Sequence, residues 1–117
     1  MDVTVFLGRT LEVIIDRPLG SRHPVHGFMY PVNYGYVPGT LAADGEPVDA
    51  YVLGVFDPLD RFTGTCIAVV QRLDDDDDKL VVVPPGRTYT TAQIRALTEF
   101  QERFFTSQIR LSATLIR

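Results

Sequence analysis

The sequence predicts a mainly β fold with one helix (class α+β), arranged as a small barrel-like domain with the helix packed against it. Short runs rich in Val, Ile and Tyr recur between Gly and Pro residues, which is typical of strands. Several of these runs are apolar at consecutive rather than alternating positions, as expected of strands that are covered on both faces. One well-marked helical segment follows them near the C-terminus.

The strands are expected, in chain order, at residues 3–7, 11–15, 50–56, 66–70 and 80–83. The helix is predicted to begin after Thr90, because Thr90 and Gln93 have the spacing of a capping box. Its apolar stripe is expected to cover the barrel core, and it consists of Ile94, Leu97, Phe100 or Gln101, and Phe104. Residues 110–117 fit either a final strand or a frayed tail.

Length and composition predict a single soluble domain over residues 1–117 with one hydrophobic core. The chain has 15 acidic and 11 basic residues, a formal charge of −4, and five of the acids lie in one run at residues 74–78. Without that run the charge would be −4 + 5 = +1, so the acidity is local. We expect no nucleic-acid partner, because a basic stripe is lacking, and no membrane span or signal peptide. A cytoplasmic location is the resulting expectation.

The single cysteine and the two histidines have ordinary structural interpretations. Cys66 lies in an apolar run and is expected to be a small core residue rather than a nucleophile. His23 and His26 lie in the polar stretch 18–40, which is long for an idle loop in so small a domain. The evidence that they bind zinc is weak, because no third ligand is near in the sequence. The favoured interpretation is that they are ordinary loop histidines.

The segment 44–49 places three carboxylates within six residues, directly before an apolar strand. Gathered carboxylates raise one another's pKa unless a cation neutralises them, and hard oxygen ligands favour Mg²⁺. The alternative is a solvated turn in which Asp44-Gly45 makes the bend while Glu46 and Asp49 face water.

The second acidic group, residues 74–78, connects two predicted strands and is also compatible with a charged hairpin tip. It is followed by Lys79, the only lysine of the chain. Two acidic groups at strand ends, this lysine, and a loop with Arg22 and Tyr34 together predict a metal-loaded phosphate site.

The motifs resemble those of the family I soluble inorganic pyrophosphatases. Residues 30–38, Tyr-Pro-Val-Asn-Tyr-Gly-Tyr-Val-Pro, and residues 44–49, Asp-Gly-Glu-Pro-Val-Asp, resemble the family's two signature segments. Residues 77–84 resemble its second acidic block, and residues 15–18 its Glu-Ile-Pro entry. The resemblance implies an OB-like five-stranded barrel with flanking helices, Mg²⁺ dependence, hydrolysis of pyrophosphate to two phosphates, and a homo-oligomer.

The resemblance also implies roles for individual residues. Glu46 would be the general base, in place of the family's Asp, and Tyr34 and Lys79 would contact phosphate in catalysis. Arg22 would be a further phosphate-binding cation. The metal ligands would be Asp44, Asp49, Asp77 and either Asp74 or Asp75, with Asp16 replacing a further acidic residue of the site.

The sequence departs from the family at three places. The segment before Tyr30 is short, so the chain resembles a trimmed variant; Phe104-Phe105 replaces a phosphate-binding Tyr-Lys pair; and Glu46 is one methylene longer than the usual Asp. Two alternatives therefore stay open beside an inorganic diphosphatase: a hydrolase of another, nucleotide-like phosphoanhydride, and a catalytically weak phosphate-binding or assembly module. An oligonucleotide-binding barrel is the most distant possibility.

Overall fold

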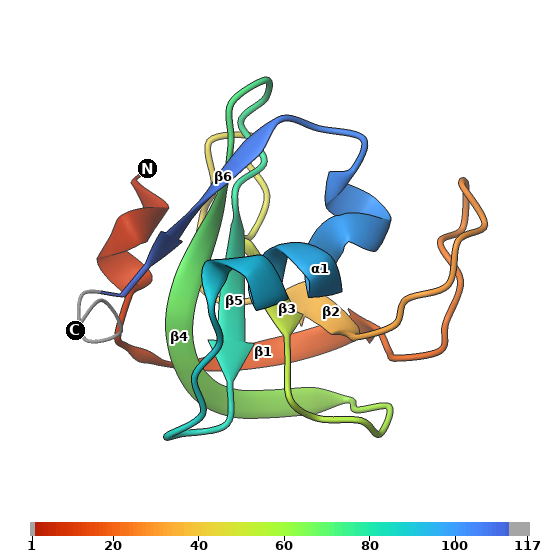
Figure 1. Ribbon diagram of the computed structural model, residues 1–117, viewed down its shortest axis with the longest axis horizontal. Helices are drawn as coiled ribbons and strands as arrows, with labels where there is room; N and C mark the ends of the chain where they lie inside the picture. The colour runs from red at the N-terminus through yellow and green to blue at the C-terminus, as the bar shows by residue number, and fades with distance from the viewer. Residues whose placement is uncertain (1, 113–117) are drawn as a thin grey trace.

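The strands of the protein close into a barrel, in a computed structural model that describes residues 2–112 (Figure 1). The elements are η1 (Val3–Phe6), β1 (Thr10–Arg17), β2 (Asn33–Tyr36), β3 (Asp49–Val52), β4 (Arg61–Arg72), β5 (Lys79–Val83), α1 (Thr91–Glu102) and β6 (Ser107–Leu111). The barrel order is β1-β2-β3-β5-β4, and the additional pairing of β1 with β4 closes it. This confirms the predicted five-stranded barrel with a C-terminal helix.

All neighbouring strands are antiparallel except β3 and β5, which run parallel. The 12-residue strand β4 pairs first with β1 and then with β5, and β6 adds to its outer part. A register shift between Cys66 and Ala68 marks a bulge where β4 turns from one partner to the next. Such bulges bend a strand strongly, as the curvature of β4 in Figure 1 shows.

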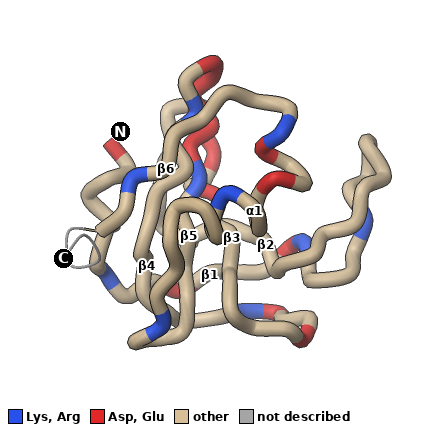
Figure 2. Tube along the Cα trace, viewed as in Figure 1, with Lys and Arg blue, Asp and Glu red and all other residues tan. Residues whose placement is uncertain are grey.

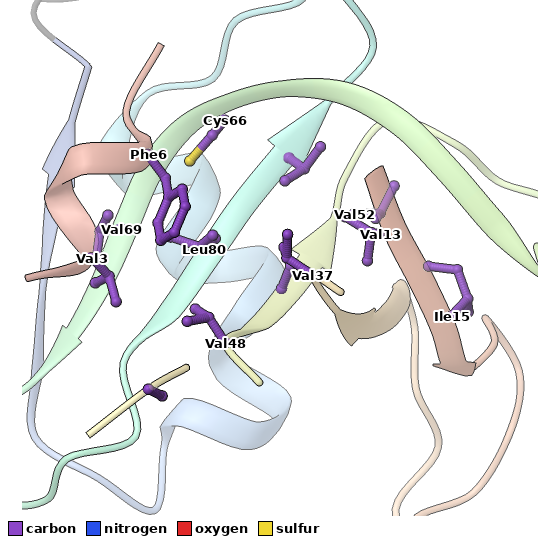
Figure 3. Close-up of a cluster of buried hydrophobic side chains, with 13 residues drawn as sticks. Val3, Phe6, Val13, Ile15, Val37, Val48, Val52, Cys66, Val69 and Leu80 are labelled. Atoms are coloured by element: carbon purple, nitrogen blue, oxygen red, sulfur yellow. The ribbon is translucent and has the colours of Figure 1, made fainter. Parts of the chain in front are cut away.

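Two apolar clusters lie on opposite faces of the barrel wall. The interior cluster, shown in Figure 3, includes Leu80 and Val82 of β5, whereas Val81 and Val83 belong to a second cluster under α1 with Ile94. All five residues of β5 are buried, so the consecutive apolar pattern is explained by burial on both faces.

Two sequence predictions are wrong at the level of elements. Residues 3–6 form a 3₁₀ helix rather than a strand. Its two buried residues, Val3 and Phe6, are three positions apart in the sequence. The stretch 18–40 is not entirely loop, because it contains β2, where a Cβ on Gly35 would overlap the carbonyl of Ile14. A short polar strand with a central glycine gives little periodic signal.

The helix prediction is confirmed. Thr90 and Gln93 form the reciprocal capping box, and α1 begins at Thr91. Residues 110 and 111 belong to β6, and the remainder of the segment 110–117, apart from Ser112, lies outside the described residues. No helix within residues 2–112 has the length and apolar character needed to cross a bilayer.

The core position of Cys66 generates a test. The side chain is fully buried, and burial raises the pKa of its thiol to about 11. Because the thiolate is the reactive form, we expect the native protein at pH 8 to react with a disulfide reagent at least about tenfold more slowly than the urea-unfolded chain. The reaction is followed by the absorbance of the thiol that the reagent releases. Equal rates in the folded and unfolded states would contradict the burial of Cys66 in the barrel interior.

Candidate active site

One cavity of about 550 Å³ lies between the barrel wall, the C-terminal end of α1 and the loop 18–32. We call this loop the 18–32 arm; backbone hydrogen bonds from His23 to Phe28 and from Tyr30 to Ser21 fold it back on itself. The cavity is lined by Asp16, Arg17, His23, His26, Phe28, Tyr30, Tyr34, Asp49, Arg72, Asp77, Lys79, Gln101, Phe104 and Phe105.

Lys79 lies at the centre of the charged part of this cavity. It begins β5 and is in parallel register with Asp49, which begins β3. Its Nζ lies 2.8 Å from Asp49 Oδ2 and 2.7 Å from Asp77 Oδ2, and only 2% of its side chain is exposed. A buried ammonium loses its hydration, so these two carboxylates are what makes its burial tolerable.

Tyr34 supplies a neutral donor beside this ion pair. Its hydroxyl donates to Asp49 Oδ2 at 2.9 Å, the same oxygen that contacts Lys79. Burial of the ring, together with the charge of Asp49, raises the pKa of Tyr34 well above its usual range. The hydroxyl therefore stays protonated at neutral pH and acts as a hydrogen-bond donor.

Arg72, at the end of β4, is a second buried cation. It donates to both oxygens of Glu102 at 3.0 Å, from Nε and from one terminal nitrogen. The other terminal nitrogen contacts Asp75 at 3.2 Å and Asp77 at 3.5 Å, and the guanidinium lies 3.6 Å from the ring centroid of Phe105. Burial alone would lower the pKa of Arg72, but the bonds to Glu102 raise it, so the group stays charged.

A buried hydrogen-bond network ties Glu102 to the barrel. Tyr51 donates to Glu102 Oε2 at 2.6 Å, and Gln101 Nε2 donates to the Tyr51 hydroxyl at 2.8 Å. The Tyr30 hydroxyl in turn donates to Gln101 Oε1 at 3.1 Å. The end of α1 thus holds Arg72 and the base of the 18–32 arm in fixed positions.

The structure brings together only part of the predicted site. Asp16, Tyr34, Asp49, Asp77 and Lys79 all line the cavity. Acidic positions gather at the β4–β5 connection (Figure 2), where Asp77 reaches the cavity while Asp74 and Asp75 do not line it. Asp74 accepts from the amide of Thr106, and Asp75 pairs with Arg72.

Asp44, Glu46 and Arg22 also lie outside the lining. Asp44 Oδ1 accepts the amide of Glu46 at 3.0 Å, in an exposed turn that bends at Gly45 with a φ of 85°. The bend at Asp44-Gly45 and the exposed Glu46 match the solvated turn that the sequence offered as the alternative to metal binding, whereas Asp49 pairs with Lys79 in the cavity. Arg22 donates instead to the carbonyl of Gly27 within the 18–32 arm. The roles of these three residues stay predictions.

Four of the lining residues that were not among the predicted site residues have basic side chains: Arg17, His23, His26 and Arg72. The position of Arg72, two residues before the acidic run, was the available signal. His23 Nδ1 accepts from the amides of Val25 and His26 at 3.1 Å, which places the proton of the neutral ring on Nε2. Partial burial lowers the pKa of His23, so the neutral form is favoured.

Within residues 2–112 no group of three or more His, Cys, Asp or Glu side chains is close enough to form a metal site by itself. Asp16, Asp49 and Asp77 nevertheless offer carboxylate oxygens to one cavity. Partial desolvation raises the pKa of Asp16, with the charge of Asp49 acting in the same direction and Arg17 opposing it. Such a donor set is compatible with Mg²⁺, which takes few protein ligands together with water and phosphate oxygens.

Comparisons with known proteins agree with these features. Among curated relatives, the inorganic pyrophosphatase of Ralstonia nicotianae is 48% identical over 42 residues, which are 36% of this chain and 21% of that protein. That of Helicobacter pylori is 71% identical over 24 residues, or 20% of this chain and 14% of that protein. The matched segments thus span about a fifth or less of these relatives.

Solved structures share the fold over most of the chain. The inorganic pyrophosphatase of Ehrlichia chaffeensis superposes with a TM-score of 0.72 at 20% identity, covering 93% of this chain and 90% of that one. The enzyme from Thermus thermophilus gives 0.68 at 17% identity, covering 92% and 85%. The sequence profile of the inorganic pyrophosphatase family matches residues 12–111, and the chain therefore belongs to this family.

Proposed function

We propose that the protein hydrolyses inorganic pyrophosphate to two phosphates in a Mg²⁺-dependent reaction. The observation that carries this proposal is the convergence of Asp49 and Asp77 on Lys79, at 2.8 and 2.7 Å, beside the Tyr34 hydroxyl. Membership of the inorganic pyrophosphatase family supports the same substrate. Similarity of fold alone would not support a particular substrate, because proteins with one fold can have many different activities.

The charges that line the cavity explain why a metal is needed. Three acids, Asp16, Asp49 and Asp77, face three permanent cations, Arg17, Arg72 and Lys79, so the lining is close to neutral without a metal. Pyrophosphate is a polyanion, and a neutral lining holds it weakly. A divalent cation bound to the carboxylates would make the net charge of the lining positive. The Arg and Lys side chains could then interact with phosphate oxygens instead of the carboxylates.

The residues that would hold Mg²⁺ are Asp49 and Asp77, with Asp16 beside them. When bound, the metal would neutralise phosphate charge and lower the pKa of a coordinated water. Asp44 and Glu46 enter the proposal through the family motif alone, because neither of them lines the cavity in this structure. The proposed base, Glu46, would have to come within hydrogen-bond reach of the attacking water.

The chain's own donors would act on the phosphates. In hydrolysis the oxygen of water forms a bond to one phosphorus while the bond from that phosphorus to the bridging oxygen breaks. The second phosphate leaves with the bridging oxygen, and the two protons of the water end on the two products. Lys79, Tyr34 and Arg72 would hold the oxygens of the leaving phosphate by hydrogen bonds that are strengthened by charge.

Arg72 would take the place of the phosphate-binding lysine that the family motif leads one to expect near the end of α1, where this chain has Phe105. Phe105 carries no charge, but its ring lies against the guanidinium of Arg72, which Glu102 holds through two bonds. A guanidinium held in this way loses little conformational freedom when it binds phosphate. A cytoplasmic location and a homo-oligomer remain part of the proposal, and exposed apolar side chains such as Val25, Phe56 and Phe104 are compatible with the latter.

The first prediction compares neighbouring aspartates of the acidic run. We expect Asp77→Asn to lower kcat for magnesium pyrophosphate by about 10²-fold, because it removes a carboxylate that faces Lys79 and Arg72 in the cavity. Asp76→Asn is the matched control, since Asp76 is exposed and outside the lining, and should be nearly neutral. The measurement is phosphate release by purified protein with and without Mg²⁺. Equal rates for the two variants would contradict the assignment.

The second prediction concerns the support of Arg72. We expect Glu102→Gln to lower the free energy of unfolding by about 2–4 kcal/mol, because it leaves a buried guanidinium without its main countercharge. Where the variant folds, KM for pyrophosphate should rise more than kcat falls. Glu99→Gln, on the exposed face of the same helix, is the control. Urea unfolding and steady-state kinetics test both effects, and an unchanged midpoint would show that the pair contributes nothing.

A further inference from the structure

The cavity has two chemically different parts. The charged part, on the barrel, holds Lys79, Arg72 and the three carboxylates described above. The other part, which we call the aromatic wall, consists of His23, His26, Phe28 and Phe104, from the 18–32 arm and the turn after α1. We propose that the cavity takes an organic phosphoanhydride, a nucleoside diphosphate, with its diphosphate at Lys79 and Arg72 and its base against the aromatic wall. This inference rests on the proposed hydrolysis of phosphoanhydrides.

The aromatic wall is built from rings that support one another. The His23 and His26 rings lie 4.6 Å apart between centroids, and Phe104 lies 6.3 Å from both His26 and Phe28 in a stacked orientation. Phe28 is anchored from behind by an edge-on contact with Phe100 of α1 at 5.7 Å. Phe104 nevertheless remains 57% exposed. A flat ring laid against it would cover apolar surface that the protein itself leaves open.

The size of the cavity exceeds what pyrophosphate needs. Its volume of about 550 Å³ falls within the roughly 300–1,000 Å³ typical of sites for drug-sized organic ligands. Pyrophosphate, two phosphoryl groups and a bridging oxygen, would occupy only the charged part. A molecule that extends its diphosphate with an organic group would fill both parts at once.

The lining chemistry favours a flat ring over an aliphatic chain. None of the lining residues, within the part of the chain that the structure describes, is Leu, Ile, Val or Met. The wall instead offers aromatic rings and imidazole nitrogens, and His23 carries a proton on Nε2 when neutral. Nucleobases stack on such rings and carry hydrogen-bonding edges, whereas an isoprenoid tail would need branched aliphatic neighbours.

The reaction on such a substrate balances in the same way as on pyrophosphate. The oxygen of water forms a bond to the terminal phosphorus, and the bond from that phosphorus to the bridging oxygen breaks. The nucleoside monophosphate leaves with the bridging oxygen, and the protons of water end on the products and in the solvent. No reactant beyond water and the proposed divalent cation is required.

The test uses the full chain and three substrates with Mg²⁺: inorganic pyrophosphate, ADP, and geranyl diphosphate as the aliphatic comparison. We expect kcat/KM for ADP to equal or exceed that for pyrophosphate and to exceed that for geranyl diphosphate. Phe104→Leu keeps an apolar side chain but removes the ring, and should lower the ratio of kcat/KM for ADP to that for pyrophosphate by about tenfold. Phe56→Leu, at an exposed aromatic outside the cavity, should leave the ratio unchanged.

The outcomes separate this inference from the proposed function. Turnover of pyrophosphate without ADP, preference for geranyl diphosphate, or an unchanged ratio in Phe104→Leu would each overturn the nucleotide inference and leave the pyrophosphatase proposal standing. If no substrate turns over, the proposed function fails, and calorimetry with α,β-methylene-ADP and methylenediphosphonate decides the inference. Tighter binding of the nucleotide analogue that is lost in Phe104→Leu would support it, and equal binding of the two would overturn it.

Discussion

The parallel pairing of β3 with β5 is the constraint on which the site depends. Both strands begin with a charged residue, and the parallel register places Asp49 beside Lys79 at the same edge of the barrel. The stem of Lys79 is enclosed by the wall, so its ammonium can be buried only where carboxylates replace water. Asp49 from β3 and Asp77 from the connection that precedes β5 supply these carboxylates, so the ion cluster depends on the pairing of β3 with β5.

The end of α1 extends this arrangement to the far side of the cavity. Glu102 lies at the last turn of the helix and binds both Arg72 of β4 and Tyr51 of β3. This buried contact joins the helix to the barrel by charge as well as by the apolar cluster around Ile94. Phe104 and Phe105 follow directly, so one helix terminus positions both a cation and the aromatic wall.

The structure brings the predicted site residues into one cavity mainly where they belong to strands, and less where they belong to turns. Tyr34, Asp49 and Lys79 lie on paired strands, whose register brings them together. Asp44 and Glu46 lie in an exposed turn, where Asp44 accepts a hydrogen bond from the backbone amide of Glu46. Arg72 was missed because a single arginine at the end of an apolar run has no distinctive spacing, and only its contact with Glu102, 30 residues away, shows it to be buried.

The sequence by itself determined the barrel class, the start of the helix and the family motifs, because periodicity, capping and turn chemistry are local properties of the chain. It also placed Lys79 beside acids. The tertiary structure alone decided which acids share a cavity and that His23, His26 and Phe104 line the same cavity. It also decided that residues 3–6 form a 3₁₀ helix whose Val3 and Phe6 pack into the interior cluster. Those properties arise from contacts between distant segments, which barrel closure and the docking of α1 create and which no local pattern encodes.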